Sequence, residues 1–87
     1  MEQRFGDNVW RIRQARRLSQ EQLAERAGVH RTQITLIERG QRQPGIGTAV
    51  RLAGALEVSP ASLFEGIRWD AGAGELLIED PPELPRV

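Results

Sequence analysis

The most regular hydrophobic pattern in this chain of 87 residues lies between residues 18 and 40. Two short helical patterns, at 20–27 and 31–38, are separated by a turn that contains Gly28. The inward positions are Leu23, Ala24 and Ala27 on the first helix, and Val29, Ile34 and Ile37 on the second. Glycine adopts positive φ just past a helix end without a Cβ penalty, which permits a sharp turn. The spacing therefore predicts a helix-turn-helix, whose two helices cross at about 90–120°.

The remaining pattern predicts more helices and then a change of structure. The expected helices lie at 5–16, 20–27, 31–38, 47–56 and 60–65. After Gly66, apolar alternation at 67–70 and 75–79 around a glycine-containing turn predicts a short β-hairpin. The expected fold class is all-α: a compact five-helix domain over 1–66 with a hairpin extension at 67–79. Residues 80–87, which contain three prolines, are expected to form a disordered tail.

Three groups of residues in this pattern resemble the Cro/CI-repressor type of helix-turn-helix, also called the XRE family. They are Leu18-Ser19-Gln20-x-Gln22-Leu23-Ala24, Gly28-Val29, and Ile34-x-x-Ile37-Glu38-Arg39-Gly40-x-x-x-Pro44. The resemblance covers residues 4–65. It implies a sequence-specific, double-stranded DNA-binding transcriptional regulator that acts as a homodimer on a palindromic operator. Within the family, the chain is similar to restriction–modification controller proteins, phage-type repressors and antitoxin autoregulators, with a lean toward the controllers.

The resemblance places helix 31–38 in the major groove, where its outward side chains reach base edges. Base contacts are expected from Arg31, Thr32, Thr35 and Leu36. Arg31 is the foremost candidate because a guanidinium donates two hydrogen bonds to guanine O6 and N7, with a phosphate contact as the alternative. DNA backbone contacts are expected from Gln20, Gln33, Arg39, Arg42 and Gln43. For the last three, the alternative is a solvated basic loop.

Three other polar residues are given structural roles. The resemblance implies that Arg13 and Glu38 pair with each other and join the first helix to the end of the third. Such a pair fixes geometry more than it adds stability, because desolvation offsets much of the Coulomb attraction. His30 stands where the family usually has a Ser or Thr cap. Imidazole is a poorer cap, so we expect a less firmly started helix or a phosphate contact.

The charge of the chain is divided along its length, although the net charge is zero. Residues 1–45 hold nine Arg and five acidic residues, whereas residues 46–87 hold three Arg and seven acidic residues. The basic half contains the helix-turn-helix, which suits a DNA-facing side. With no Cys, no Tyr and one His, the chain offers no metal site and little for catalysis, so neither a cofactor nor an enzyme is expected. It has no apolar run of membrane-span length and no signal-peptide core, which predicts a cytoplasmic protein.

Residues 60–79 are acidic and rich in apolar side chains, which predicts a protein interface that avoids DNA. The expected dimer interface consists of Leu63, Phe64, Ile67, Trp69, Leu76 and Ile78. The alternative is a hairpin that folds back and closes the core of its own domain. A second functional hypothesis is an antitoxin-like module that binds a toxin through this acidic part and also regulates its own operon.

Overall fold

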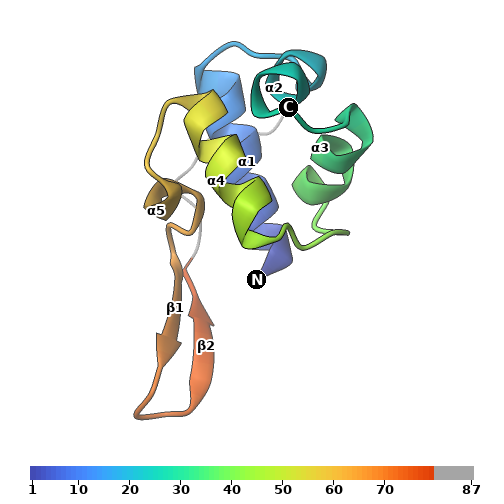
Figure 1. The fold of residues 1–87 in the computed structure, drawn as a ribbon. Coiled ribbons are helices and arrows are strands. Elements are labelled where there is room, and N and C mark those ends of the chain that lie inside the picture. The colour runs from blue at the N-terminus through green and yellow to red at the C-terminus, as the bar shows by residue number, and fades with distance from the viewer. Residues whose placement is uncertain (80–87) are drawn as a thin grey trace.

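The computed structural model describes residues 1–79, which form five helices followed by a two-stranded sheet (Figure 1). The elements are α1 (Glu2–Ala15), α2 (Gln20–Ala27), α3 (Arg31–Glu38), α4 (Ile46–Leu56), α5 (Pro60–Leu63), β1 (Ile67–Asp70) and β2 (Glu75–Ile78). The predicted fold class, a five-helix domain with a short C-terminal hairpin, is confirmed. The predicted tail, residues 80–87, lies outside the described residues.

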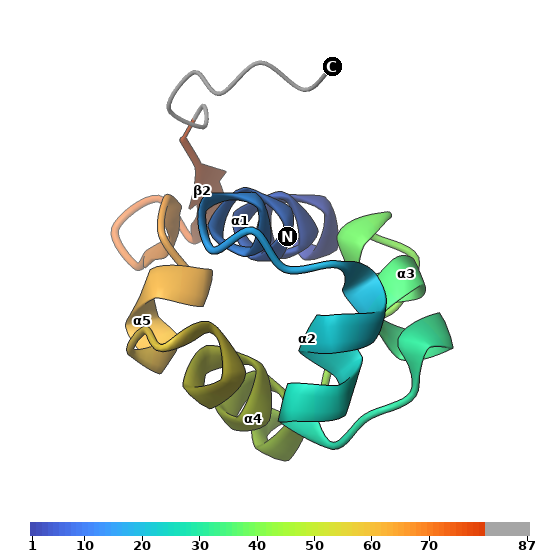
Figure 2. The ribbon, with the colours of Figure 1, turned by 90° about the horizontal axis from the view of Figure 1, so that it is seen from above.

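The helices surround a single core, as the view from above shows (Figure 2). Each helix contributes apolar side chains to this core, and the fully buried ones include Val9, Leu23, Ile34, Ile37, Leu52, Leu56 and Leu63. The predicted inward positions of α2 and α3 all belong to this cluster or pack against it. Helix α3 is therefore fixed to the rest of the domain by apolar burial along its inner face.

The two ends of α2 form as the sequence predicts. Ser19 accepts a hydrogen bond from the Gln22 backbone, and the Gln22 side chain returns one to the Ser19 N–H, which is a capping box. At the other end, Gly28 adopts a left-handed conformation with φ 70°. Its N–H and that of Val29 bond to carbonyl groups of the last turn of α2.

Gly6 lets α1 approach α3 at backbone distance. A Cβ added at this position would overlap the carbonyl oxygen of Ile37 and lie 2.9 Å from that of Glu38. No other residue type fits here without moving one helix. The contact places α1 against the C-terminal end of α3 and so contributes to the orientation of α3.

The β-hairpin leaves the helical body beside α5, on the side away from α3 (Figures 1 and 2). Its strands pair antiparallel with Ile67 opposite Ile78 and Trp69 opposite Leu76. Residues directly opposite each other in a sheet point to the same face. Ile67, Trp69, Leu76 and Ile78 therefore share one face, as the alternation predicts, whereas Leu77 lies on the other face, opposite Arg68.

Two buried polar side chains of α1 tie the base of the hairpin to the domain. Arg4, which is 5% exposed, donates hydrogen bonds to the carbonyl oxygens of Glu65 and Glu79 at 3.0 and 2.7 Å. Asn8 donates to the carbonyl oxygens of Leu63 and Glu65 at 2.9 and 3.0 Å. Both residues were absent from the sequence-based predictions. The bonds fix the direction in which the hairpin leaves the body.

Some element boundaries differ from the predictions. Helix α1 begins at Glu2 rather than at residue 5. The polar residues before Phe5 are already helical, and the Phe5 N–H donates a hydrogen bond to the carbonyl oxygen of Met1. Helix α5 ends at Leu63 rather than at residue 65, since Gly66 with φ 81° turns the chain into β1. None of the helices described is both long and apolar enough to cross a membrane.

Candidate nucleic-acid interface

The outer face of α3 carries the side chains expected to contact bases. Arg31 and Thr32 occupy its first turn and are exposed, and Thr35 and Leu36 are half-buried. The inner face is closed by Ile34 and Ile37 in the core, so these four side chains remain accessible to a ligand along the helix. The geometry agrees with the predicted division of α3 into a packed face and a presenting face.

A hydrogen-bonded chain behind α3 joins three helices. Arg13 Nε and Nη2 lie 2.6 and 2.9 Å from the two carboxylate oxygens of Glu38. Glu38 Oε1 also accepts from Gln20 Nε2 at 3.1 Å, and Gln20 Oε1 accepts from the Thr35 hydroxyl at 2.9 Å. The predicted pair is thus present as a bidentate contact, and both of its members are buried. A bidentate Arg–carboxylate pair holds a fixed geometry, so this chain sets the position of α3 against α1 and α2.

The same series of hydrogen bonds determines which atoms Gln20 and Thr35 leave free for a ligand. The Thr35 hydroxyl donates to Gln20, so towards a base it presents its oxygen lone pairs and its methyl group. Gln20 retains one amide hydrogen at the start of α2. This link could not be predicted from local sequence patterns, because hydrogen bonding between residues 15 positions apart depends on how the helices cross.

His30 caps α3 in place of the usual Ser or Thr. Its Nδ1 accepts from the Thr32 N–H at 3.1 Å, and its own N–H donates to Gln33 Oε1 at 3.2 Å. The expectation of a weakly started helix is therefore not met, since a reciprocal cap is present. Gln33, expected at the DNA backbone, is engaged in this cap and is half-buried.

Arg31 has an acidic neighbour that was not predicted. Its Nη1 lies 3.6 Å from Glu21 Oε1, and both side chains are more than half exposed. Exposed pairs of this kind contribute only about 0–1 kcal/mol, so the guanidinium exchanges readily to a stronger partner. Glu21 thus holds Arg31 near the exposed face of α3 without neutralising it permanently.

Further cations and a hollow border this surface. Arg39 and Arg42 are exposed, and their side chains make no hydrogen bond or ion pair within residues 1–79; Gln43 is also exposed in the loop after α3. A hollow of about 480 Å³ opens between α1, the start of α2 and the end of α3. Its lining includes Trp10, Gln20, Thr35 and Arg39. Of the residues expected to contact the DNA backbone, Gln20 and Arg39 therefore lie beside the presenting face of α3.

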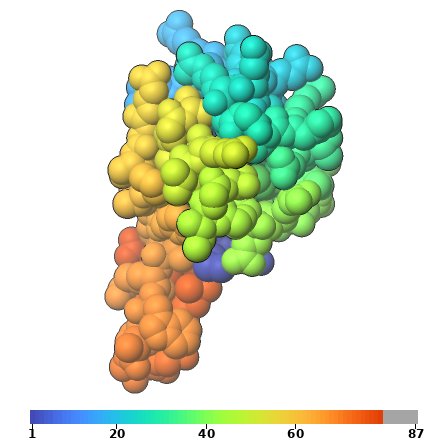
Figure 3. Space-filling model, in the orientation of Figure 1, coloured from blue at the N-terminus to red at the C-terminus, as the bar shows by residue number. Residues whose placement is uncertain are grey.

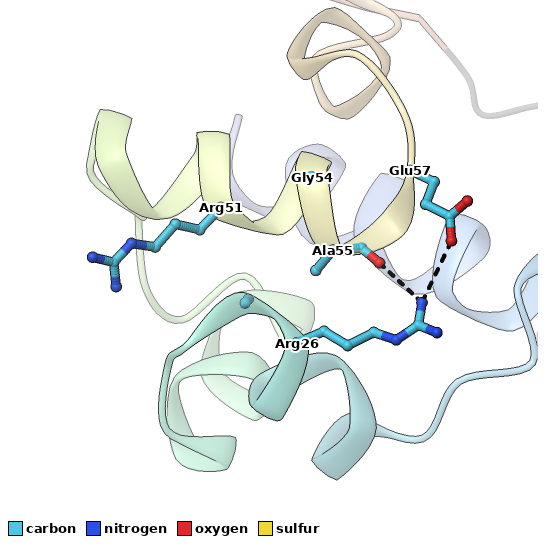
Figure 4. A pocket seen from close by; sticks show the side chains of 6 residues that line it. Arg26, Arg51, Gly54, Ala55 and Glu57 are labelled. Atoms are coloured by element: carbon cyan, nitrogen blue, oxygen red, sulfur yellow. Dashed lines mark hydrogen bonds and ion pairs between the residues drawn. The ribbon is translucent and has the colours of Figure 1, made fainter.

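A further hollow, of about 360 Å³, lies between α2 and α4 (Figure 4). Arg26 crosses one end, within 3.4 Å of the Ala55 carbonyl and 3.7 Å of Glu57. The Arg51 side chain points to the opposite end. Gly54 and Ala55, which have small or no side chains, line the hollow between the two arginines. The hollow has no nucleophile or paired acid and base. Nor do His, Cys, Asp or Glu residues gather as a metal-binding group anywhere in the described part of the chain.

The residues predicted for the dimer interface divide into buried and exposed ones. Leu63 is fully buried in the domain core, so it has no surface to offer a partner. Ile67 is half-buried against that core. The exposed members of the set are Phe64, Trp69, Leu76 and Ile78.

Comparison with known proteins identifies the fold. The helix-turn-helix family HTH_3 matches residues 11–63. Control protein C.SmaI of Serratia marcescens is 40% identical over 70 residues, which cover 78% of this chain and 83% of that protein. Control protein C.BamHI of Bacillus amyloliquefaciens is 39% identical over 70% of this chain and 76% of its own length. Two longer curated regulators are matched over only 31% and 53% of their length.

A solved structure agrees with these relatives. The restriction-modification controller protein C.AhdI from Aeromonas hydrophila superposes with a TM-score of 0.71 at 38% identity, covering 72% of this chain and 96% of that chain. The family resemblance seen in the sequence is confirmed. These relatives are regulators and not enzymes, as the composition predicts. The chain therefore belongs to the HTH_3 (XRE-type) family of helix-turn-helix transcriptional regulators.

Proposed function

We propose that the protein binds double-stranded DNA sequence-specifically as a homodimer and regulates transcription, with α3 in the major groove. The observation that carries this proposal is the exposed first turn of α3. Arg31 and Thr32 project from it, in the position where recognition helices of this motif meet base edges. Arg31 reads a guanine, Thr32 contacts a base or the backbone, and Leu36 contacts a thymine methyl group.

The surroundings of α3 supply the contacts to phosphates. The hollow at the start of α2 accommodates a phosphate between Gln20 and Arg39, aided by backbone N–H groups at the helix N-terminus. Arg42 and Gln43 follow the DNA backbone from the next loop. These contacts hold the protein in register without reading sequence.

The proposed homodimer follows from the small size of α3. One helix of eight residues presents four side chains to the groove, which specify only a few base pairs. Two copies related by a two-fold axis read two half-sites about one helical turn apart, on one face of the duplex. The operator is therefore palindromic.

Similarity to named control proteins favours one regulatory setting. C.SmaI and C.BamHI are control proteins, and C.AhdI is a restriction-modification controller protein. We infer that this chain likewise controls genes of a restriction–modification system. The antitoxin interpretation gains no support from these relatives.

Selection of bound sequences from a pool of random duplexes tests the proposal. At physiological salt the purified protein should enrich a two-fold-related motif whose half-sites are about one turn apart. Titrations at several salt concentrations should give a log–log slope of about −0.9 per phosphate contact. Equal affinity for the enriched motif and for random duplex would overturn the proposal.

A further inference from the structure

We propose that the β-hairpin is a dimerisation arm whose apolar face packs on a second copy of this chain. The arm is residues 67–78. The inference rests on the homodimer proposed above and assigns the surface that forms it. The family match ends at residue 63, before the arm begins. The arm therefore requires an account of its own.

The apolar face of the arm is complete in register, and three of its four side chains are exposed. Ile67, Trp69, Leu76 and Ile78 share this face, because the register places them in two directly opposite pairs. Trp69 is 64% exposed, and Leu76 and Ile78 are 42% and 46% exposed. A two-stranded hairpin is marginal in water unless it packs on something. Exposed apolar area concentrated on one face marks an interaction site.

Hydrogen bonds to the helical body hold the base of the arm in place. Arg4 and Asn8 fix its base through four hydrogen bonds to backbone carbonyl groups, and both are buried. Glu79 N–H also bonds to the Gly66 carbonyl at 2.8 Å and extends the ladder past the last strand residue. A surface that is rigid before binding loses less conformational entropy on association. These contacts make the hairpin a fixed projection of the domain.

The same chain carries a second apolar surface on its body. Ile46 and Val50 of α4 are 87% and 52% exposed, and Phe64 is 44% exposed although its ring packs edge-on against Phe5. The arm of the same copy leaves these residues uncovered. The space-filling view shows the front of α4 and the projecting arm on one side of the molecule (Figure 3). The two apolar surfaces of one copy do not contact each other. Association of two copies buries both of them.

Charge also favours a second copy as the occupant. Between residues 67 and 79, one Arg stands against three acidic residues, so the arm is acidic. DNA is therefore an unfavourable partner for it. The nine Arg of residues 1–45 belong to the half of the body that we assign to DNA, so charge keeps nucleic acid away from the arm and leaves its apolar face to a second copy. The self-complementary contact is closed by a two-fold axis, as the proposed operator requires.

A pair of neighbouring substitutions tests the arm. Successive strand residues point to opposite faces. Trp69→Ser therefore removes the most exposed side chain of the apolar face, whereas Arg68→Ser changes the other face. In sedimentation equilibrium of the full chain, Trp69→Ser should raise the dimer dissociation constant about tenfold or more, as expected for a central aromatic contact. Arg68→Ser should leave it within about twofold. Equal constants for wild type and Trp69→Ser, or a monomeric wild type, would overturn the proposal.

Fluorescence follows the same event without disturbing the arm. The chain has two tryptophans, so Trp10→Phe leaves Trp69 as the only indole. Its emission should shift to shorter wavelength as concentration rises and the dimer forms. A dimer that forms with unchanged Trp69 emission would exclude the arm from the interface.

A duplex with one half-site separates this proposal from the DNA-binding proposal. Trp69→Ser should bind the single half-site as the wild type does and lose affinity only for the complete two-fold site. If the wild type prefers no sequence, the proposed function fails, whereas sedimentation still decides the role of the arm. If Trp69→Ser binds the complete site with wild-type affinity as a dimer, the arm proposal fails and the DNA-binding proposal stands.

Discussion

Glu38 is a buried carboxylate whose charge is balanced by one guanidinium. It is 4% exposed, Arg13 is 7% exposed, and the two bond in bidentate fashion. Removing one member of a buried pair leaves the other charge without compensation, which costs about 3–5 kcal/mol. Glu38→Ala should therefore lower the free energy of unfolding by that amount in urea titrations. Glu25→Ala, at an exposed site on α2, is the matched control and should change it by less than about 0.5 kcal/mol.

The double variant Arg13→Met/Glu38→Leu distinguishes charge from packing. Replacing both members by apolar side chains of similar volume should recover most of the loss, because no uncompensated charge remains. Equal effects of Glu38→Ala and Glu25→Ala would show that the pair does not hold α1 to α3.

Glu21 tests whether the presenting face meets DNA. Its carboxylate lies 3.6 Å from Arg31 and would repel a nearby phosphate. Glu21→Gln should raise affinity for all duplexes a few-fold, since exposed pairs are worth about 0.2–1 kcal/mol. Fluorescence anisotropy titration measures the change, with Glu25→Gln as the control on the same helix. Unchanged or weaker binding by Glu21→Gln would place DNA away from Arg31.

Single residues also show where sequence reasoning ends. The Arg13–Glu38 pair and the exposed Arg31 were predicted, because the family resemblance covers those positions. Arg4 and Asn8 were missed: a polar residue on a helix is ordinarily solvated, and only the returning chain near Gly66 buries them. Leu63 was assigned to an interface, yet α5 ends so that its side chain enters the core.

At the level of elements, two glycines within helices differ in the space around them. Gly6 sits where α1 touches the backbone of α3, whereas no atom lies within 4 Å of a Cβ placed on Gly54. Gly6→Ala should destabilise the protein by about 1–3 kcal/mol or more through overpacking. Gly54→Ala should stabilise it by up to about 1 kcal/mol through helix propensity. Thermal unfolding of both variants checks the pair, and destabilisation of the same size at both positions would contradict this packing.

The start of α3 gives a second test at this scale. The His30 ring accepts from Thr32 N–H, so His30→Ala should lower the free energy of unfolding by about 0.5–2 kcal/mol. His30→Ser restores an acceptor at the same place and should recover stability. Urea titrations of the two variants compare them directly. A stable His30→Ala variant would mean that the helix does not depend on its cap.

Most elements were predictable from local signals. Apolar periodicity located α2, α3 and α4, and strand alternation located the hairpin and its apolar face. The start of α1 was placed three residues late, because residues 2–4 give no apolar signal although they are helical. The capping role of Gln33 was hidden by an unusual cap residue.

For the whole molecule, the two proposed functions occupy opposite sides. Helix α3 lies on one side of the helical body, and the acidic arm leaves beside α5 on the other (Figure 1). The division of charge along the chain, basic in residues 1–45 and acidic in residues 46–87, agrees with this arrangement. The position of the arm could not be predicted, because it depends on long-range bonds from Arg4 and Asn8.

The central claim is that α3 reads base pairs while the following loop holds the DNA backbone. Affinities of wild type, Arg31→Ala and Arg42→Ala, measured across all single base-pair variants of the selected site, test it most directly. Arg31→Ala should lose about 1–3 kcal/mol and its discrimination at one base pair in each half-site. Arg42→Ala should weaken binding to every variant alike and reduce the salt slope. Identical patterns for the two variants, with discrimination retained throughout, would contradict the account.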